Sequence, residues 1–323
     1  MNAMQTLATS ELSEVLKRQK YQIIGRHSAS KKCRWLHKSL IEDKPCYKQR
    51  FYGIQSHRCI QMTPTLDCNM RCKFCWRIQP DDFLMPWILA STTEWDEPAE
   101  IVQESIKAQR KILSGYKGQV IQGKVDRDKY REASEPRHVA ISLDGEPTFY
   151  PFLSSLIHEY RKRELTVFLV TNGTNPHAIE ALKEEPSQLY VSLSAPDEST
   201  FITSCKPSIP DAWNRLMRTL SILPSLSCPT AIRITLVRGL NLKNPRGYAR
   251  LLDPISPTYV EPKSYMYVGW SRRRLTFESM PSHHEIVDFS KDLAQHMSYK
   301  MIDESPESRV ALLSELERPK RLC

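Results

Sequence analysis

Short apolar runs alternate with longer amphipathic stretches along most of this chain. Each apolar run is rich in β-branched or aromatic residues and ends near Gly, Pro, Asp or Asn, which is typical of β-strands. The predicted strands are Cys59–Pro64, His138–Leu143, Thr166–Thr171, Leu189–Ser194, Ala231–Val237 and Ser264–Val268. Predicted helices lie between them at 97–114, 152–163, 176–184, 208–222 and 245–252. This alternation predicts parallel βα units, and six units without a dinucleotide-binding glycine fingerprint favour an open, partial α/β barrel.

The segments outside these units have weaker patterns. Residues 10–20 have a weak helical pattern, and the stretch from Cys33 to Cys59 is polar, aromatic and basic without a clean period, so we interpret it as irregular. Residues 115–137 are almost entirely polar, which favours a solvated excursion before the second strand, with contact to an RNA partner as the alternative.

The C-terminal part has a clearer pattern. We expect a helix at 282–297, followed by a strand pair at Tyr299–Asp303 and Val310–Leu313. The expected parts are therefore an N-terminal extension at 1–58, a core barrel at 59–279 and a C-terminal helix and strand extension at 280–323.

Composition narrows the class of protein. No run of about 18 apolar residues exists, so we expect no membrane span. The N-terminus lacks the apolar core of a signal peptide, so we expect a cytoplasmic protein. Nine cysteines in a reducing compartment indicate metal binding rather than disulfides. The formal net charge of +9 fits an anionic partner such as RNA, although it is also consistent with a solubility feature.

Three cysteines lie within one short loop, Cys68, Cys72 and Cys75, with Phe74 just before the last. Three thiolates can hold three corners of a [4Fe–4S] cluster and leave the fourth iron open. A zinc site or a reduced loop is the alternative, but zinc favours paired C-x2-C units and a fourth ligand. The loop follows the first predicted strand, where barrel active sites lie. Its spacing resembles the radical S-adenosylmethionine (SAM) signature, in which Phe74 would lie beside the adenine or the cluster; a core aromatic is the alternative.

Polar residues also follow the other predicted strands. Gly145 allows a close backbone approach, and Glu146 can accept hydrogen bonds from an ammonium group. With Pro147 they resemble the G-G-E motif that holds the amino group of SAM, although Asp144 replaces the first glycine. The other candidate SAM contacts, each also consistent with a simple turn or strand residue, are Asn172, Ser192 and Arg233.

A second set of cysteines precedes the first. Cys33, Cys46 and Cys59 are thirteen residues apart each time, a weak signal because isolated cysteines are often buried small hydrophobes. Cys59 begins the strand that leads to Cys68, so a second cluster could face the first across the barrel mouth. We assign no role to Cys205, Cys228 and Cys323.

Several runs resemble the archaeal tRNA 4-demethylwyosine synthase family. These are 46–54, 56–64, Ser142–Thr148, Val170–Thr174, Ser192–Asp197, Pro262–Met266 and the tail from Asp303 to Leu313. The resemblance covers about residues 33–313 and is most specific in its N-terminal part.

This resemblance implies a radical SAM enzyme with a partial (β/α)6 TIM-type barrel. The family condenses N1-methylguanosine at position 37 of phenylalanine tRNA with pyruvate to form 4-demethylwyosine, the tricyclic ring step of wyosine and wybutosine biosynthesis. The implied cofactors are SAM and two [4Fe–4S] clusters. Their implied ligands are the six cysteines of the two sets.

The resemblance also implies a catalytic role for Lys48, which matches the lysine proposed to condense with pyruvate. A Schiff base needs a neutral lysine, which burial or nearby positive charge favours. Two alternatives remain: the open iron of the second cluster holds pyruvate, or Lys48 neutralises cluster charge.

The partners that follow are tRNA, pyruvate and an external electron donor of the flavodoxin or ferredoxin type, because this length leaves no room for the flavodoxin-like domain of eukaryotic relatives. We expect a monomer. Candidate phosphate contacts are Arg34, Lys38, Arg50, Arg58, Arg272, Arg273 and Arg274. The alternative functions are a radical SAM enzyme that modifies a peptide or another RNA, and a non-catalytic, metal-stabilised RNA-binding protein.

Overall fold

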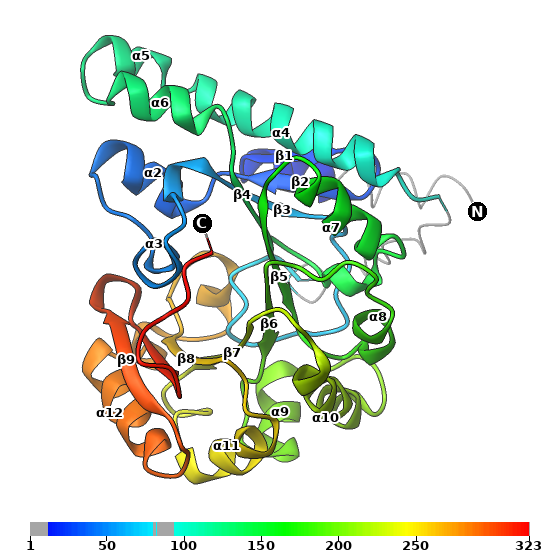
Figure 1. Ribbon diagram of the computed structural model, residues 1–323, viewed down its shortest axis with the longest axis vertical. Coiled ribbons are helices and arrows are strands. Elements are labelled where there is room, and N and C mark those ends of the chain that lie inside the picture. Colours follow the sequence, from blue (N-terminus) through cyan, green and yellow to red (C-terminus); the bar gives the residue numbers. More distant parts are fainter. Residues whose placement is uncertain (1–11, 80–81, 83–93, 323) are drawn as a thin grey trace.

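Six adjacent parallel strands form the centre of the computed structural model, which describes residues 12–79, 82 and 94–322 (Figure 1). The strands are β3 (Cys59–Thr63), β4 (His138–Ile141), β5 (Thr166–Thr171), β6 (Gln188–Ser192), β7 (Thr230–Leu236) and β8 (Tyr259–Ser264). Each of them pairs in parallel with the next along the chain. The sheet curves into a partial barrel that is not closed, which confirms the predicted fold class.

Antiparallel strands extend both edges of this parallel core. On one edge β1 (Tyr21–Ile24) and β2 (Ser28–Lys31) form a hairpin, and β2 pairs with β3. On the other edge β10 (Val310–Ser314) lies between β8 and β9 (Lys300–Ser305). The predicted C-terminal strand pair is therefore present, and the N-terminal hairpin is an addition that the sequence pattern did not indicate.

Helices cover the outer face of the curved sheet (Figure 1). They are α4 (Pro98–Ser114), α7 (Leu153–Arg161), α8 (Pro176–Glu180), α9 (Glu198–Cys205), α10 (Ala212–Ile222), α11 (Pro245–Leu252) and α12 (His283–Ala294). Alternate strand residues such as Val167 and Leu169 pack with these helices in the main apolar core, whereas Phe168 belongs to a separate cluster inside the barrel. The period of two along each strand therefore separates an outer core from the barrel interior.

The last parallel strand lies five residues earlier than the predicted Ser264–Val268. The aromatic run at Tyr265–Val268 favoured the later position, whereas the real strand contains Glu261, Pro262 and Lys263. The side chain of Glu261 is fully buried, and Tyr52, Tyr190 and Arg233 donate hydrogen bonds to it. A charged strand interior of this kind depends on partners that are distant in sequence, which a local pattern cannot show. The sequence pattern also did not predict helix α9.

The N-terminal stretch is not irregular, because it contains α2 (Arg34–Ile41) and α3 (Tyr47–Tyr52). Tyr47, Phe51 and Tyr52 of α3 pack inside the barrel against aromatic residues near the starts of β5, β6 and β8. The ring centroids of Tyr52 and Tyr259 lie 5.3 Å apart. Helix α3 therefore fills the amino end of the barrel, and its six residues are too few to show a helical period.

The polar segment at 115–137 is likewise folded rather than only solvated. It forms α5 (Lys117–Ile121) and α6 (Arg127–Ala133), and Val125 and Ala133 are buried in a small apolar cluster with Leu36 and Leu40 of α2. A few apolar residues thus anchor a mostly polar helical pair. No helix in the described part of the chain is long and apolar enough to cross a membrane.

Candidate functional site

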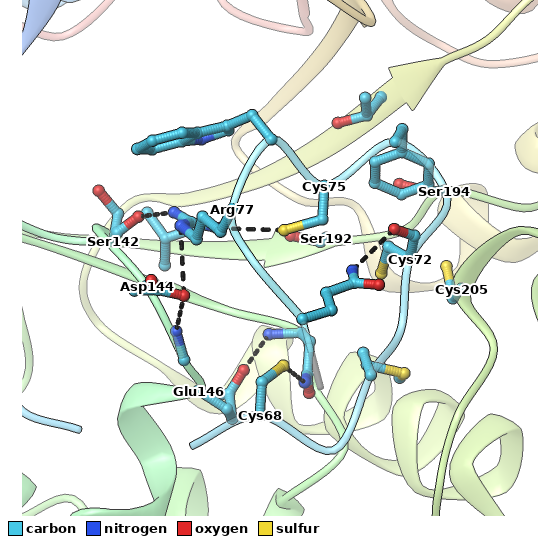
Figure 2. Close-up of a pocket in the computed structure, with 18 of the residues that line it drawn as sticks. Cys68, Cys72, Cys75, Arg77, Ser142, Asp144, Glu146, Ser192, Ser194 and Cys205 are labelled. Carbon is cyan, nitrogen blue, oxygen red and sulfur yellow. Dashed lines mark hydrogen bonds and ion pairs between the residues drawn. The ribbon is translucent and has the colours of Figure 1, made fainter. Parts of the chain in front are cut away.

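A cavity of about 400 Å³ opens at the carboxyl ends of the parallel strands (Figure 2). The cysteine loop after β3 forms one wall, and the ends of β4 to β8 form the rest. Of the predicted site residues, the cavity lining contains Cys68, Cys72, Cys75, Phe74, Gly145, Glu146, Asn172, Ser192 and Arg233. The lining does not contain Pro147, Lys48 or the cysteines of the N-terminal set.

Backbone contacts fix the cysteine loop against the end of β4. Gly145 has φ +62°, and a Cβ atom there would lie 2.2 Å from the carbonyl oxygen of Thr65. The amide of Glu146 donates to the carbonyl oxygen of Asp67 at 2.6 Å. Only glycine permits this close approach, so Gly145 positions the start of the loop that carries the cysteines.

The end of α9 holds the middle of the same loop. The amides of Arg71 and Lys73 donate to the carbonyl oxygens of Cys205 at 3.0 Å and Ser204 at 2.9 Å. Figure 2 shows the side chains of Cys72 and Cys205 next to each other, and the Cys205 thiol helps to raise the pKa of Cys72. Cys205 is therefore a site residue that sequence reasoning left without a role.

Two arginines hold the last turn of the loop. Arg274 pairs with Asp82 and donates to the carbonyl oxygens of Lys73 and Cys75. Arg77 lies 4.0 Å from the Cys75 sulfur and 3.8 Å from Asp144, and it also donates to two carbonyl oxygens of the β4 end. Arg274 is thus bound inside the protein and not free to contact phosphate. Asp144, in the position of the motif's first glycine, pairs with this loop.

The three loop thiols are close enough to affect one another. Burial raises the pKa of Cys68 and Cys75, and the neighbouring thiols raise it further. The neighbouring thiol of Cys205, followed by burial, raises the pKa of Cys72. These partly buried thiols raise one another's pKa. A bound cation that replaces their protons would stabilise the thiolates, so this donor set fits an iron–sulfur cluster.

The second set of cysteines is assembled from three elements. Cys33 and Cys46 immediately precede α2 and α3, and Cys59 is the first residue of β3. Burial raises the pKa of Cys33 and Cys59, and each of these thiols is affected by the charge of Cys46. The structure therefore brings these cysteines together.

Their position differs from the one expected. They lie at the amino end of the barrel, where Cys59 starts β3, whereas the Cys68 loop follows the carboxyl end of the same strand. The expectation that the two sets face each other across the barrel mouth is wrong, because Cys59 lies at the opposite end of β3 and none of Cys33, Cys46 and Cys59 lines the cavity.

Neither set forms a site for a single ion. Among the described residues, no three His, Cys, Asp or Glu side chains converge closely enough to hold one metal ion. Each cysteine ligand of a [4Fe–4S] cluster binds a different iron, so the sulfurs need not converge as zinc ligands do.

Glu146 lies at the centre of a hydrogen-bond network between β4 and β5. One carboxylate oxygen accepts from the hydroxyls of Thr171 at 2.6 Å and Thr148 at 2.8 Å, and from the Thr148 amide. The other oxygen accepts from the Asn172 amide at 2.7 Å. Burial raises the pKa of Glu146, while these donors oppose that rise. The second oxygen retains acceptor capacity toward the cavity.

The remaining candidate SAM contacts have different surroundings. The Asn172 side chain donates to Asn69 at 2.9 Å and lies 3.9 Å from the Cys68 sulfur. Phe74 packs against the main apolar core. Pro147 is buried at the start of a short 3-10 helix, so its role is to shape the chain after Glu146.

Lys48 lies beneath the cavity, inside the aromatic cluster around α3. Its Nζ atom is 3.9 Å from the ring centroid of Phe168 and 4.3 Å from that of Tyr190. Burial, with help from Arg233, lowers the pKa of Lys48 to about 8. A lysine with this pKa is neutral more often than an exposed one, which suits a nucleophile.

Family models divide the chain into two matched parts. The radical SAM superfamily matches residues 62–252, and the family described as wyosine base formation matches residues 254–315. The wyosine-forming match thus begins just before β8 and covers α12, β9 and β10.

Individual relatives match nearly the whole chain. The S-adenosyl-L-methionine-dependent tRNA 4-demethylwyosine synthase of Pyrococcus horikoshii is 49% identical over 308 residues, which cover 94% of this chain and 88% of the relative. The enzyme of the same name from Methanocaldococcus jannaschii is 42% identical over 312 residues, with 95% and 97% coverage.

A solved structure described as TYW1 with a lysine-pyruvate adduct bound is similar throughout, with a TM-score of 0.84, 41% identity, and coverage of 96% of this chain and 98% of that one. Identity at this level over nearly full length, together with the arrangement of the cysteine loop and the strand ends, shows that this chain belongs to the S-adenosyl-L-methionine-dependent tRNA 4-demethylwyosine synthase family.

Proposed function

We propose that this enzyme condenses N1-methylguanosine at position 37 of phenylalanine tRNA with pyruvate to form 4-demethylwyosine. One observation carries the proposal beyond family membership. The cavity extends from the Cys68 loop to Arg233 and Lys263, and Lys48 lies directly behind that cationic wall. A radical-generating end and an anion-binding end therefore share one barrel, as a reaction between a methylated base and a keto acid requires.

Membership of the radical SAM superfamily implies SAM and a [4Fe–4S] cluster as cofactors. When bound, they supply a 5′-deoxyadenosyl radical, which is the difficult chemistry of the reaction. Cys68, Cys72 and Cys75 would hold the cluster. Glu146 would accept a hydrogen bond from the amino group of SAM, with Gly145 and Asn172 beside it. Phe74, Ser192 and Arg233 would complete the cofactor contacts around the cavity.

A second cluster on Cys33, Cys46 and Cys59 is part of the same proposal. Its support is the mutual proximity of these three thiols at the amino end of the barrel. The amides of Trp35 and Leu36 also donate to the Cys33 sulfur and lower its pKa against the effect of burial. Donors of this kind favour the thiolate that a metal ligand must be.

Lys48 is the residue we propose to engage pyruvate. A neutral amine attacks the keto carbon, and loss of the carbonyl oxygen as water leaves a C=N bond. The support is the burial of Lys48, its lowered pKa and a related structure described as holding a lysine-pyruvate adduct. In its present position Lys48 is covered by Tyr190 and Phe168, so a change of its side-chain rotamer must accompany adduct formation.

The tRNA would present its methylated base by extruding it from the anticodon loop into the cavity, as base-modifying enzymes commonly require. Of the candidate phosphate contacts, Arg272 and Arg273 lie at the end of a 3-10 helix (Gly269–Arg273) that directly follows the cavity-lining residue Val268. We further propose that an external flavodoxin or ferredoxin supplies electrons to a monomeric enzyme. We expect it to work in the cytoplasm, where thiols stay reduced.

The direct test is anaerobic incubation of reconstituted enzyme with SAM, pyruvate, a reductant and phenylalanine tRNA. Digestion and mass spectrometry should detect 4-demethylwyosine when the tRNA carries N1-methylguanosine and nothing new when it carries unmodified guanosine. Because phosphate contacts release counterions, activity should fall steeply with salt. Absence of the tricyclic nucleoside with active SAM cleavage would contradict the proposal.

A further inference from the structure

Lys263 is a lysine of the cavity wall, and sequence reasoning gave it no role. It lies on β8 and lines the cavity, unlike Lys48. Its Nζ atom donates to the carbonyl oxygen of Ser308 at 2.5 Å and lies 5.2 Å from the ring centroid of Tyr47. An ammonium group on a cavity wall, fixed by one hydrogen bond, retains two further N–H donors for a ligand.

The charges around Lys263 are not balanced. Arg233 pairs with Glu261 at 3.2 Å and also donates to the hydroxyl of Tyr47. Glu261 in turn accepts from Tyr52 at 2.6 Å and from Tyr190 at 2.9 Å, so its oxygens are occupied. Among the described residues, no carboxylate lies within ion-pair distance of Lys263 or Lys48. Glu261 is thus paired with Arg233 alone, and neither lysine has an ion-pair partner in the part of the chain that the structure describes.

The pKa of Lys263 agrees with this shortage. Burial, followed by the charge of Arg233, lowers the pKa of Lys263 to about 7, and Glu261 and Cys46 only partly oppose this effect. A bound anion would stabilise the ammonium form. The thiolates of the second cysteine set are one source of negative charge, and a ligand carboxylate in the cavity is the other.

Lys263 and Lys48 each contact one member of the same group of side chains. The guanidinium carbon of Arg233 is 4.6 Å from the ring centroid of Tyr190 and 5.9 Å from that of Tyr47. Lys48 contacts the first of these rings and Lys263 the second. The carboxylate carbon and the keto carbon of pyruvate are bonded to each other, so a carboxylate held by Lys263 would keep the keto carbon close to the same group of side chains.

We propose that Lys263 binds the carboxylate of the α-keto acid co-substrate and so directs its keto carbon toward Lys48. This inference rests on the proposed function, because it assumes that pyruvate enters this barrel. It makes Lys263 the residue that selects a 2-oxo acid over an uncharged ketone or ester. Arg233, whose charge is already paired with Glu261, shapes the wall but leaves the new ion pair to Lys263.

Borohydride trapping on the reconstituted enzyme tests this. Pyruvate and its uncharged methyl ester are titrated against wild type, Lys263→Met and Lys263→Arg, and the labelled peptide is identified. Lys183→Met, which removes an exposed lysine, is the matched control. Losing one charge-assisted contact should raise the half-saturating pyruvate concentration roughly tenfold or more in Lys263→Met, with partial recovery in Lys263→Arg. Methyl pyruvate should be trapped equally by all four proteins.

The possible results separate the two hypotheses. The inference is overturned if the half-saturating pyruvate concentration of Lys263→Met equals that of wild type. It is also overturned if the adduct is located on Lys263 itself. An equal loss of the trapped adduct with pyruvate and with methyl pyruvate, together with a loss of bound iron, also overturns the inference. That result would show that Lys263 neutralises the second cluster. If wild type gives no adduct, the Lys48 part of the proposed function fails. The KM for pyruvate in product formation then decides the inference, which requires a rise of the same size in Lys263→Met with kcat less affected.

Discussion

The two cysteine sets of this protein are built in opposite ways. Cys68, Cys72 and Cys75 share a single loop. Three sets of contacts fix this loop, from Gly145 and Glu146, from the end of α9 and from Arg274. Cys33, Cys46 and Cys59 come from separate elements and meet only when α2 and α3 dock at the amino end of the barrel. The first set is therefore encoded by local spacing, whereas the second is a product of tertiary structure.

Their surroundings differ as much as their construction. The loop thiols lie near Glu146, Asn172 and Cys205, which are uncharged or anionic groups. A cation, Arg77, also lies beside these thiols, next to Cys75. The second set faces Lys48 and lies near the cationic wall of Arg233 and Lys263. Under the proposed function, the first set would lie beside a zwitterionic cofactor with an amino group and the second beside a small anion.

The largest effect is expected from the loop set. Changing Cys68, Cys72 and Cys75 together to Ala should remove about half of the bound iron, because each set is expected to hold one cluster. Formation of 5′-deoxyadenosine should stop completely. Iron analysis and chromatography of the small-molecule products measure both. Continued cleavage of SAM by this variant would show that the loop does not hold the reactive cluster.

The second set should separate SAM cleavage from product formation. Changing Cys33, Cys46 and Cys59 to Ala should also remove about half of the iron. Some 5′-deoxyadenosine should still form, while the tricyclic nucleoside should not. If a folded triple variant loses all of its iron, the two sets form one interdependent site and the comparison is wrong.

Lys48 should affect chemistry without affecting either cluster. Lys48→Ala and Lys48→Arg should keep their iron and still cleave SAM, but neither should give a borohydride-trapped adduct or product, because only a lysine amine forms the C=N bond. Lys183→Met serves again as the surface control. Full turnover by Lys48→Ala would remove this residue from the mechanism.

The smallest effect concerns stability alone. Ser282 and Glu285 form a capping box at the start of α12, far in sequence from both cysteine sets. Ser282→Ala should lower the free energy of unfolding by about 1 kcal/mol. Calorimetry should show a melting temperature lower by about 2 °C, with iron content and both activities unchanged. If iron is lost here too, general destabilisation rather than ligand removal explains losses in the cysteine variants.

The same contrast explains what the sequence could predict. The period of two and the strand-end residues located five of the six parallel strands, and C-x3-C-x2-C located the reactive loop. The comparisons confirm the family that the motifs indicated. The β8 strand was misplaced because burial of Glu261 depends on Tyr52, Tyr190 and Arg233, which are far away in sequence.

Other site residues had no local signal at all. Cys205 looked isolated, and only the return of α9 to the cysteine loop places its thiol beside Cys72. Lys263 looked like an ordinary charged residue, and only the curvature of the sheet turns it toward the cavity with Arg233. Spacing along the sequence can predict residues that share one loop, but it cannot predict residues that the curvature of the sheet brings together.

One measurement tests most directly the claim that both ends of this barrel act on the same substrate. Phenylalanine tRNA with a trideuterated N1-methyl group would be incubated with the enzyme, SAM, reductant and pyruvate carrying ¹³C at its keto and methyl carbons. We predict 5′-deoxyadenosine that carries deuterium, together with a 4-demethylwyosine nucleoside that contains both ¹³C atoms. Unlabelled 5′-deoxyadenosine, or a nucleoside product without ¹³C, would contradict the account.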